Sequence, residues 1–270
     1  MNKRWRAPMR LGLAIAVIAA AVALPAATLA QAQGQVQLRV MTSGGFSAPL
    51  QELQPEFEKA TGIKGIVARG ASQGVGPDTI GAQLHLGVPE DVVIMSREGL
   101  DELIAEGWIV SGTDVDLGQT PLGLSVRAGA PKPDISTVEA FKQTMLRAKS
   151  VTFPGSTTGI YLATKLFPQL GIAKEMTPKT SSTGVAAVAK GDAEIAVQPV
   201  SELLHAPGTD FVGTIPAEIQ YVSVFSAGMV KDPKQAAASR KLLDFLTSEK
   251  AKAAIKKSGM EVLAARAQGR

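Results

Sequence analysis

The chain has 270 residues, no cysteine, two histidines and a formal net charge of +4. The absence of cysteine excludes disulfides, thiolate metal sites and cysteine nucleophiles, and two histidines far apart in the sequence do not indicate a metal site. The net positive charge does not indicate nucleic acid or an acidic membrane, because four basic residues lie in an N-terminal segment that we expect to be removed.

The first thirty residues have the pattern of a secretory signal peptide. Basic residues precede the apolar run 11–24, and small residues follow it. A basic start, an apolar stretch too short to span a bilayer comfortably and a small-x-small site are typical of such a peptide. We expect cleavage after Ala30 or Ala32 and export to the periplasm as a formally neutral chain, with an uncleaved membrane anchor as the alternative. The basic residues are Lys3, Arg4, Arg6 and Arg10.

An alternating apolar strand opens the mature chain and ends in small polar residues. Val36, Leu38 and Val40 share one face, and a helix follows at 50–60, which Pro55 is expected to kink or restart. The junction offers glycines that let a ligand approach the backbone, hydroxyl groups, and the free N–H groups of the helix. The sequence therefore predicts an anion site, with a plain turn as the alternative. Its residues are Thr42, Ser43, Gly44, Gly45 and Phe46.

Two further strand–loop–helix units follow. Strand 63–68 leads into the glycine- and hydroxyl-rich loop 69–77, and the apolar strand 90–95 leads into an amphipathic helix. A continuous apolar strand is typical of a parallel sheet that is buried on both faces. Three successive units predict an open α/β sheet, in which ligands bind at the carboxyl ends of the strands.

The pattern changes after Gly118. The alternating strand 122–127 has no helix directly behind it, and a proline-rich loop and a helix with a capping box at 136–139 come next, so we place the crossing into a second lobe here. The opening motif then returns, because strand 150–153 runs into the small-residue turn 154–159. This second turn predicts that the other lobe also presents hydroxyl groups to a ligand.

The remaining elements complete a two-lobe organisation. A helix at 160–170, a short helix at 184–190 and a buried strand at 194–198 continue the second lobe. Strand 221–225 carries the chain back to the first lobe, where two helices follow, and the tail after Leu263 is expected to fray. We predict a signal peptide at 1–30, the first lobe at 31–120, the second lobe at 121–219 and the return to the first lobe at 220–270. Two α/β lobes joined by two crossings describe a hinged clamshell.

The order and spacing of several short segments along this chain resemble those of the type 2 periplasmic solute-binding proteins of ABC transporters, and within them the molybdate-binding-like branch. The likeness covers essentially the whole mature chain. It rests on the segments 42–46, 57–62, 91–94, 155–159 and 243–248. The resemblance implies an α/β two-lobe clamshell and a monomer that hands its ligand to an inner-membrane ABC permease. It also implies a small anion held in the cleft by hydroxyl and backbone N–H groups, without a salt bridge.

The resemblance also implies which residues bind the ligand. The first lobe would contribute Ser43 and Ser72. The second lobe would contribute Ser156, Thr157 and Thr158, with Thr183 or Gly184 donating at a helix start. The last ligand in that branch is a tyrosine, and here Gln198 stands near the matching position. Because of this departure, a small polycarboxylate is as good a candidate as a tetrahedral oxyanion.

A second resemblance is to the periplasmic aconitate isomerases, which are built on the same scaffold. It rests on the segments 42–46, 91–95 and 130–136, the second of which ends at Met95. It implies that a proton moves between allylic carbons of a tricarboxylate, which needs a base as well as anion-binding groups. Arg69 and Arg97, each just after a strand end, are candidates to clamp carboxylates, with solvated surface charges as the alternative.

No catalytic residue is assigned by the sequence. Glu202, Tyr161 and His85 are the candidates for an acid or base, and for His85 a surface or packing role is favoured. The glycine-rich turns lack the lysine of a phosphate loop, and no nucleophile elbow is present. The sequence thus favours capture of a small anion for an importer, with aconitate isomerase as the alternative and with no metal, cofactor or nucleic acid.

Overall fold

The computed structural model describes residues 35–263, so the predicted signal peptide and the tail at 264–270 lie outside the described residues. The first lobe is built on three parallel strands. β1 (Gln37–Thr42) lies between β2 (Lys64–Arg69) and β3 (Val92–Ser96). Because the three strands are parallel, their carboxyl ends lie at the same edge of the sheet.

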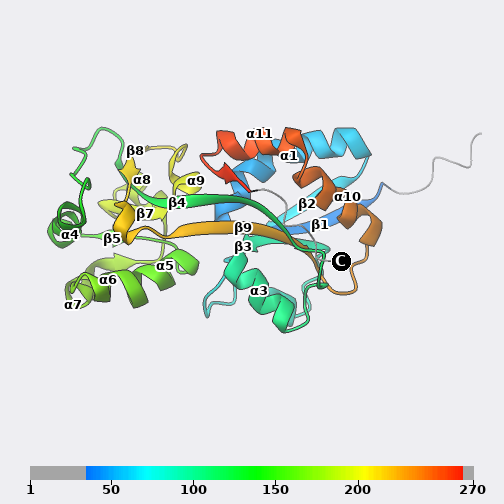
Figure 1. The fold of residues 1–270 in the computed structure, drawn as a ribbon, viewed down its shortest axis with the longest axis horizontal. Helices are drawn as coiled ribbons and strands as arrows, with labels where there is room; N and C mark the ends of the chain where they lie inside the picture. Colours follow the sequence, from blue (N-terminus) through cyan, green and yellow to red (C-terminus); the bar gives the residue numbers. More distant parts are fainter. Residues whose placement is uncertain (1–34, 264–270) are drawn as a thin grey trace, which may run out of the picture. The chain divides into compact units, whose positions relative to one another are not determined.

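The helices of this lobe cover both faces of the sheet (Figure 1). They are α1 (Gly44–Thr61), α2 (Ile80–His85), α3 (Arg97–Ala105), α10 (Ala236–Leu246) and α11 (Glu249–Lys257). The expected interruption at Pro55 is wrong, because α1 begins directly after the strand and continues through both of its prolines. Its face of Phe46, Leu50, Leu53 and Phe57 is buried in the core, where each such side chain contributes about 1.5–3 kcal/mol. That burial offsets the helical hydrogen bonds that the prolines cannot make.

Two long antiparallel strands connect the lobes and run side by side in Figure 1. β4 (Val115–Arg127) pairs with β9 (Val222–Met229) up to Pro121. From Leu122 onward β4 instead pairs with β7 (Ile195–Pro199) and β8 (Thr209–Thr214). One ten-stranded sheet therefore serves both lobes, and β4 changes its neighbours between them.

The second lobe adds two short parallel strands, β5 (Val151–Thr152) and β6 (Thr180–Ser181), beside β7. The expected helix at 160–170 is divided into two short helices around a π-helical turn at Leu162–Leu166. The segment after residue 208 forms a further strand, β8. The lobe's helices are α4 (Val138–Arg147), α5 (Thr157–Tyr161), α6 (Phe167–Gln169), α7 (Ala173–Met176), α8 (Val185–Lys190) and α9 (Val200–Leu203). Two 3₁₀ turns, Thr177–Lys179 and Ala217–Ile219, and a strand β10 (Glu261–Val262) on β4 complete the described chain.

Each lobe has its own apolar core. One cluster joins Leu38 and Val40 of β1 to α1, α10 and α11, and a second joins Met41 to α2 and α3 on the opposite face. A separate cluster around Phe141 and Met145 packs α4 to α7 against the second lobe's strands. The predicted α/β two-lobe clamshell is confirmed, and the residue numbers of the lobe boundaries remain a prediction.

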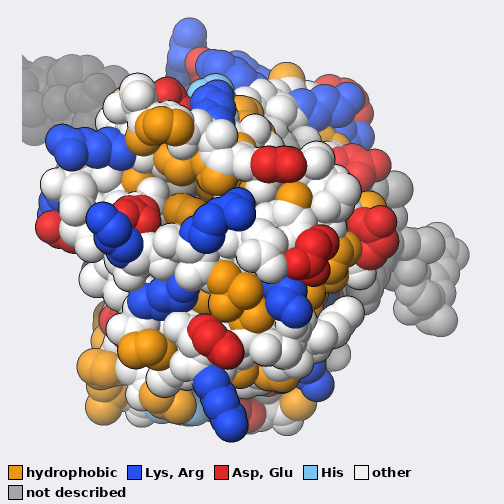
Figure 2. All heavy atoms as spheres, turned by 90° about the vertical axis from the view of Figure 1, so that its left-hand side faces the viewer, with side chains coloured by type: hydrophobic (Ala, Val, Ile, Leu, Met, Phe, Trp, Pro, Cys, Tyr) orange, Lys and Arg blue, Asp and Glu red, His pale blue; other side chains and the backbone are white. Residues whose placement is uncertain are grey.

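The surface carries charges of both signs. Figure 2 shows Lys, Arg, Asp and Glu side chains mixed with apolar ones over the end of the second lobe. None of the helices within residues 35–263 is both long enough and apolar enough to cross a membrane.

Candidate functional site: a polar cleft between the lobes

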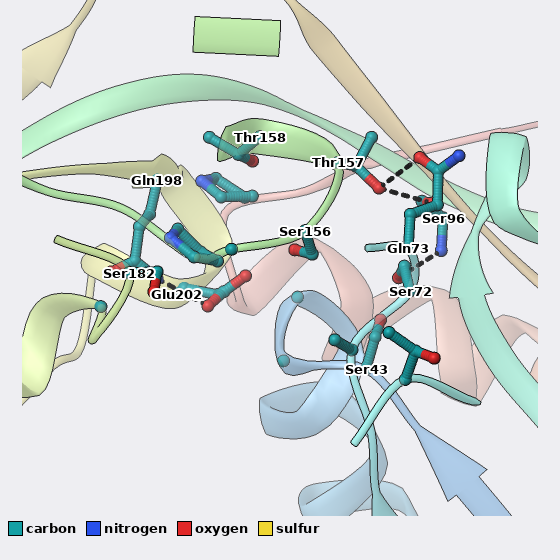
Figure 3. Close-up of a pocket in the computed structure, with 18 of the residues that line it drawn as sticks. Ser43, Ser72, Gln73, Ser96, Ser156, Thr157, Thr158, Ser182, Gln198 and Glu202 are labelled. Carbon is teal, nitrogen blue, oxygen red and sulfur yellow. Dashed lines mark hydrogen bonds between the residues drawn. The ribbon is translucent and has the colours of Figure 1, made fainter. Parts of the chain in front are cut away.

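A cleft of about 500 Å³ lies where the carboxyl ends of the strands of both lobes meet. The first lobe contributes the start of α1 after β1, the loop after β2 and Ser96 at the end of β3. The second lobe contributes the turn after β5, residues 182–184 after β6, and Gln198 and Glu202 at the end of β7 and in α9. Figure 3 shows these side chains converging from the two sides.

The start of α1 forms one wall. Ser43 is the N-cap residue and its side chain makes no cap hydrogen bond, so its buried Oγ has no partner among the described residues. Gly44 and Gly45 line the cleft, and amides in the first turn of a helix have no partner within it. The first turn of this 18-residue helix also holds no acidic residue. The wall therefore presents N–H groups and a hydroxyl to an anion.

Hydrogen bonds join the two lobes beside the cleft. Thr157 Oγ1 lies 2.9 Å from Ser96 Oγ and donates to Gln73 Oε1 at 2.9 Å. Ser96 N donates to Ser72 Oγ at 2.9 Å, which leaves the Ser72 hydroxyl proton free for a ligand. A bridge of neutral side chains thus holds the lobes together in this structure, as the dashed lines in Figure 3 show.

The opposite wall holds a carboxyl group. Gln198 Nε2 donates to Glu202 Oε2 at 2.7 Å, and the Glu202 carboxyl lies against the backbone of Gly44. Burial raises the pKa of Glu202 to about 7, and the Gln198 hydrogen bond and the positive charge of Arg69 oppose that rise. Glu202 can therefore both accept and donate a proton near neutral pH.

Three buried polar atoms of the cleft residues have no partner among the described residues. They are Ser43 Oγ, Gln198 Oε1 and Ser223 Oγ. A buried polar atom without a hydrogen bond is costly, at about 1–3 kcal/mol each. Their position fits a polar ligand that supplies the missing bonds.

Only two ionisable side chains, Glu202 and Asp78, are among the described residues that line the cleft. No lysine, arginine or histidine of residues 35–263 is in that lining, and no group of three acidic or histidine side chains in the same range could hold a metal ion. An anion in this cleft would be held by hydroxyl and amide groups, with one carboxyl group of raised pKa beside it.

The structure brings most of the predicted ligand residues together and separates others from them. Those in the cleft lining are Ser43, Gly44, Gly45, Ser72, Ser156, Thr157, Thr158, Thr183 and Gln198. Thr42, Phe46 and Met95 are wrong as ligand residues. Phe46 and Met95 point into the two cores of the first lobe, since their strand or helix turns those side chains inward. Thr42 is buried and its hydroxyl donates to the Ser43 carbonyl.

The prediction that Arg97 clamps a ligand carboxylate is wrong, and so is the alternative that it is a solvated surface charge. It is 7% exposed and its guanidinium binds Asp101, Asp114 and Asp116, with Nη1 2.8 Å from Asp114 Oδ2. Because the Arg97 guanidinium is bound by these three carboxylates, it is not available to bind a ligand carboxylate. Arg69 is exposed and also lies outside the cleft lining, although its charge acts on Glu202.

Two catalytic candidates lie away from the cleft. The Tyr161 hydroxyl donates to the Ile219 carbonyl at 3.0 Å, its ring stacks on Tyr221, and burial raises its pKa. His85 is exposed, contacts Glu106 and packs on Trp108. Of the three candidates, only Glu202 lines the cleft.

Sequence reasoning missed several cleft residues. Ser96 follows a buried strand in the same way as Ser43, so the same rule would have found it. Gln73 lies in the predicted loop 69–77, of which only Arg69 and Ser72 are predicted as ligand residues, and Asp78 and Thr79 follow that loop directly. Ser223 and Phe225 come from the crossing strand β9, where an alternating pattern gives no sign of which face meets a ligand.

The fold and the cleft define a class: two α/β lobes joined by two crossing strands, with a polar cleft between them. Residues 38–261 match the family of bacterial extracellular solute-binding proteins, and the chain belongs to this family.

Comparison with particular proteins gives two kinds of likeness. The chain is 40% identical over 245 residues to an aconitate isomerase of a Pseudomonas species, covering 89% of this chain and 94% of that one. Among solved structures it is similar to a periplasmic molybdate-binding protein of Azotobacter vinelandii, with a TM-score of 0.64, 19% identity and coverage of 84% and 100%. It is also similar to a sulfate-binding protein of Mycobacterium tuberculosis, with a TM-score of 0.62, 16% identity and coverage of 83% and 86%. The structural likenesses show the fold alone.

Proposed function

We propose that this protein is a periplasmic isomerase that moves a proton between allylic carbons of a small unsaturated polycarboxylate, as an aconitate isomerase does. The observation that carries the proposal is Glu202, a carboxyl group with a pKa of about 7 in a cleft whose other described lining residues are neutral, apart from the exposed Asp78. A carboxyl group of this kind can exchange a proton with a bound substrate, a role that the capture of an anion does not require. The 40% identity to an aconitate isomerase over nearly its full length supports the same assignment.

The proposed step moves one proton within the substrate by way of Glu202, so no other reactant is consumed. The Glu202 carboxylate removes a proton from the methylene carbon of trans-aconitate, and the C–H electron pair forms a new double bond as the old one shifts toward the neighbouring carboxylate. Donors around Ser43, Ser72 and Ser156 stabilise the charge that develops there. Protonated Glu202 then returns a proton to the carbon that was originally vinylic, which gives cis-aconitate and restores the base. The step requires no redox partner or cofactor.

The site suits both halves of this chemistry. A base with a pKa near the working pH is half ionised, so it can accept and release the proton with little cost. Neutral donors bind the three carboxylates without fixing them in ion pairs. The wall at α1 adds helix N–H groups, which favour an anion.

Capture of a small anion for an ABC permease is the second candidate. Family membership supports it, as do structural neighbours described as molybdate- and sulfate-binding proteins. The two functions differ in turnover, because a capture protein binds tightly and releases its ligand unchanged.

The experiment that separates them mixes the purified protein with trans-aconitate and follows cis-aconitate by chromatography. Thermal shift is measured in parallel with molybdate, tungstate, sulfate and trans-aconitate, since a ligand that binds only the folded state raises the melting temperature. We expect product from this protein alone, loss of turnover in Ser43→Ala, and a thermal shift with trans-aconitate. A lack of product, together with a shift by an inorganic oxyanion, would overturn the proposal in favour of capture.

A further inference from the structure

We propose that Gln198 and Gly44 are positioning residues that hold the Glu202 carboxyl group in the orientation it needs for proton transfer. This inference rests on the proposed function and goes beyond it, because it concerns how the base is aimed. Gln198 binds one carboxyl oxygen, and Gly44 provides the space in which the carboxyl group lies. Neither residue needs to touch the reacting carbon.

The hydrogen bond selects one of the two oxygens. Gln198 Nε2 donates to Oε2 of Glu202 at 2.7 Å, whereas no described residue donates to Oε1. Gln198 is only 2% exposed, so its amide has little freedom to turn away. Oε2 is thereby occupied and Oε1 is left for the substrate.

Gly44 fixes the carboxyl group from the other side. A Cβ at position 44 would lie 2.9 Å from Glu202 Oε2 and 3.2 Å from its Cδ, so the carboxyl group would have to move from this position. The backbone of Gly44 has no positive φ, so helix geometry itself does not require glycine there. The glycine is explained by the carboxyl group that lies against it.

The structure contains a matched pair for comparison. Gln54 Nε2 donates to Glu58 Oε1 at 2.9 Å, also across four residues, and this pair lies outside the cleft lining. In both pairs the amide lowers the pKa of the carboxyl group. Gln54→Met therefore removes the same kind of bond, together with a bond from Gln54 Nε2 to the Gly65 carbonyl at 2.9 Å, from a site with no role in the proposed reaction.

The test uses the protein labelled with ¹³C at the glutamate carboxyl carbons, with the Glu202 resonance assigned by its loss in Glu202→Gln. We expect a titration midpoint of about 7 in the parent, a rise of about one pH unit in Gln198→Met, and no change in Gln54→Met. The acidic limb of the pH profile of kcat/KM for trans-aconitate should move up by the same amount. An unchanged Glu202 midpoint in Gln198→Met would overturn the role of Gln198.

Gly44→Ala tests whether the Glu202 carboxyl group needs the space that the glycine leaves at position 44. We expect kcat to fall about tenfold or more, because small displacements of a base are costly. The melting temperature should stay the same or rise, since alanine is a better helix former. Full activity would overturn the role of Gly44. If the parent makes no cis-aconitate, the proposed function fails, while the carboxyl titration still decides whether Gln198 controls Glu202.

Discussion

The replacement of Arg97 by methionine tests whether this buried charge stabilises the fold or binds the ligand. The Arg97 side chain is 8% exposed and its Nη1 lies 2.8 Å from Asp114 and 3.2 Å from Asp116. Its bond to Asp101 contributes little, because Asp101 is 62% exposed and water screens it. Removing one partner of a buried ion pair costs about 3–5 kcal/mol, and Asp116 would lose its cation at 6% exposure.

The expected result is a large loss of stability without a loss of binding. At about 2–4 °C per kcal/mol for a domain of this size, the melting temperature should fall by roughly 10 °C. Calorimetry and circular dichroism measure the unfolding, and isothermal titration measures trans-aconitate binding below the transition. Asp116→Asn in the Arg97→Met background should recover part of the loss. A variant that unfolds like the parent but no longer binds the ligand would refute the reasoning and restore Arg97 as a clamp.

Three further predictions concern pH, closure and the second core. Burial raises the pKa of Glu90 from 4.5 to about 7, so the folded state binds this proton more tightly than the unfolded chain, and stability falls as pH rises through that range. Glu90→Gln should therefore be more stable than the parent at pH 8, by about 3 kcal/mol in urea unfolding, and should show a flatter pH dependence; an equal pH dependence would refute this. Thr157→Val removes the bonds to Ser96 and Gln73 that join the lobes, and should weaken trans-aconitate binding about tenfold in titration calorimetry; unchanged affinity would show that the bridge does not favour closure. Phe141→Ala opens a cavity in the second lobe's core and should cost about 3–5 kcal/mol in chemical unfolding, whereas a cost below about 1 kcal/mol would mean that the core collapses around it.

The elements of the first lobe could be predicted because the apolar periodicity and the positions of the turn residues indicate the same strands and helices there. The alternation at Leu38 and Val40, the glycine-rich turns and the apolar run at 92–95 each indicate one structure, and three such units in a row leave few topologies. The start of α1 was placed six residues late because glycines and serine gave no helical period. The long reach of β4 is not visible in the sequence, because its first half pairs with β9 and β10, which both lie about a hundred residues or more further along the chain.

The cleft could be predicted in part for a similar physical reason. Residues that follow strand ends, such as Ser43, Ser72 and Ser156, converge wherever parallel strands end together. Side-chain partners lie outside that rule. Arg97 and Arg69 have the same sequence context, and only the folding of β4 brings two aspartates onto Arg97. The position of the Glu202 carboxyl group likewise depends on α9 packing against α1, which no local pattern records.

The turnover of Glu202→Gln tests whether Glu202 is the base of the proposed reaction. Glutamine keeps the shape of the side chain and removes the base, and Glu58→Gln is the matched control outside the cleft. With trans-aconitate as substrate, we predict that kcat falls about 10²–10⁴-fold in Glu202→Gln, while the calorimetric Kd changes less than about tenfold. Glu58→Gln should keep the kcat of the parent. Undiminished turnover in Glu202→Gln would contradict the proposed role of Glu202, because the other carboxyl group among the described residues that line the cleft, Asp78, is exposed to solvent.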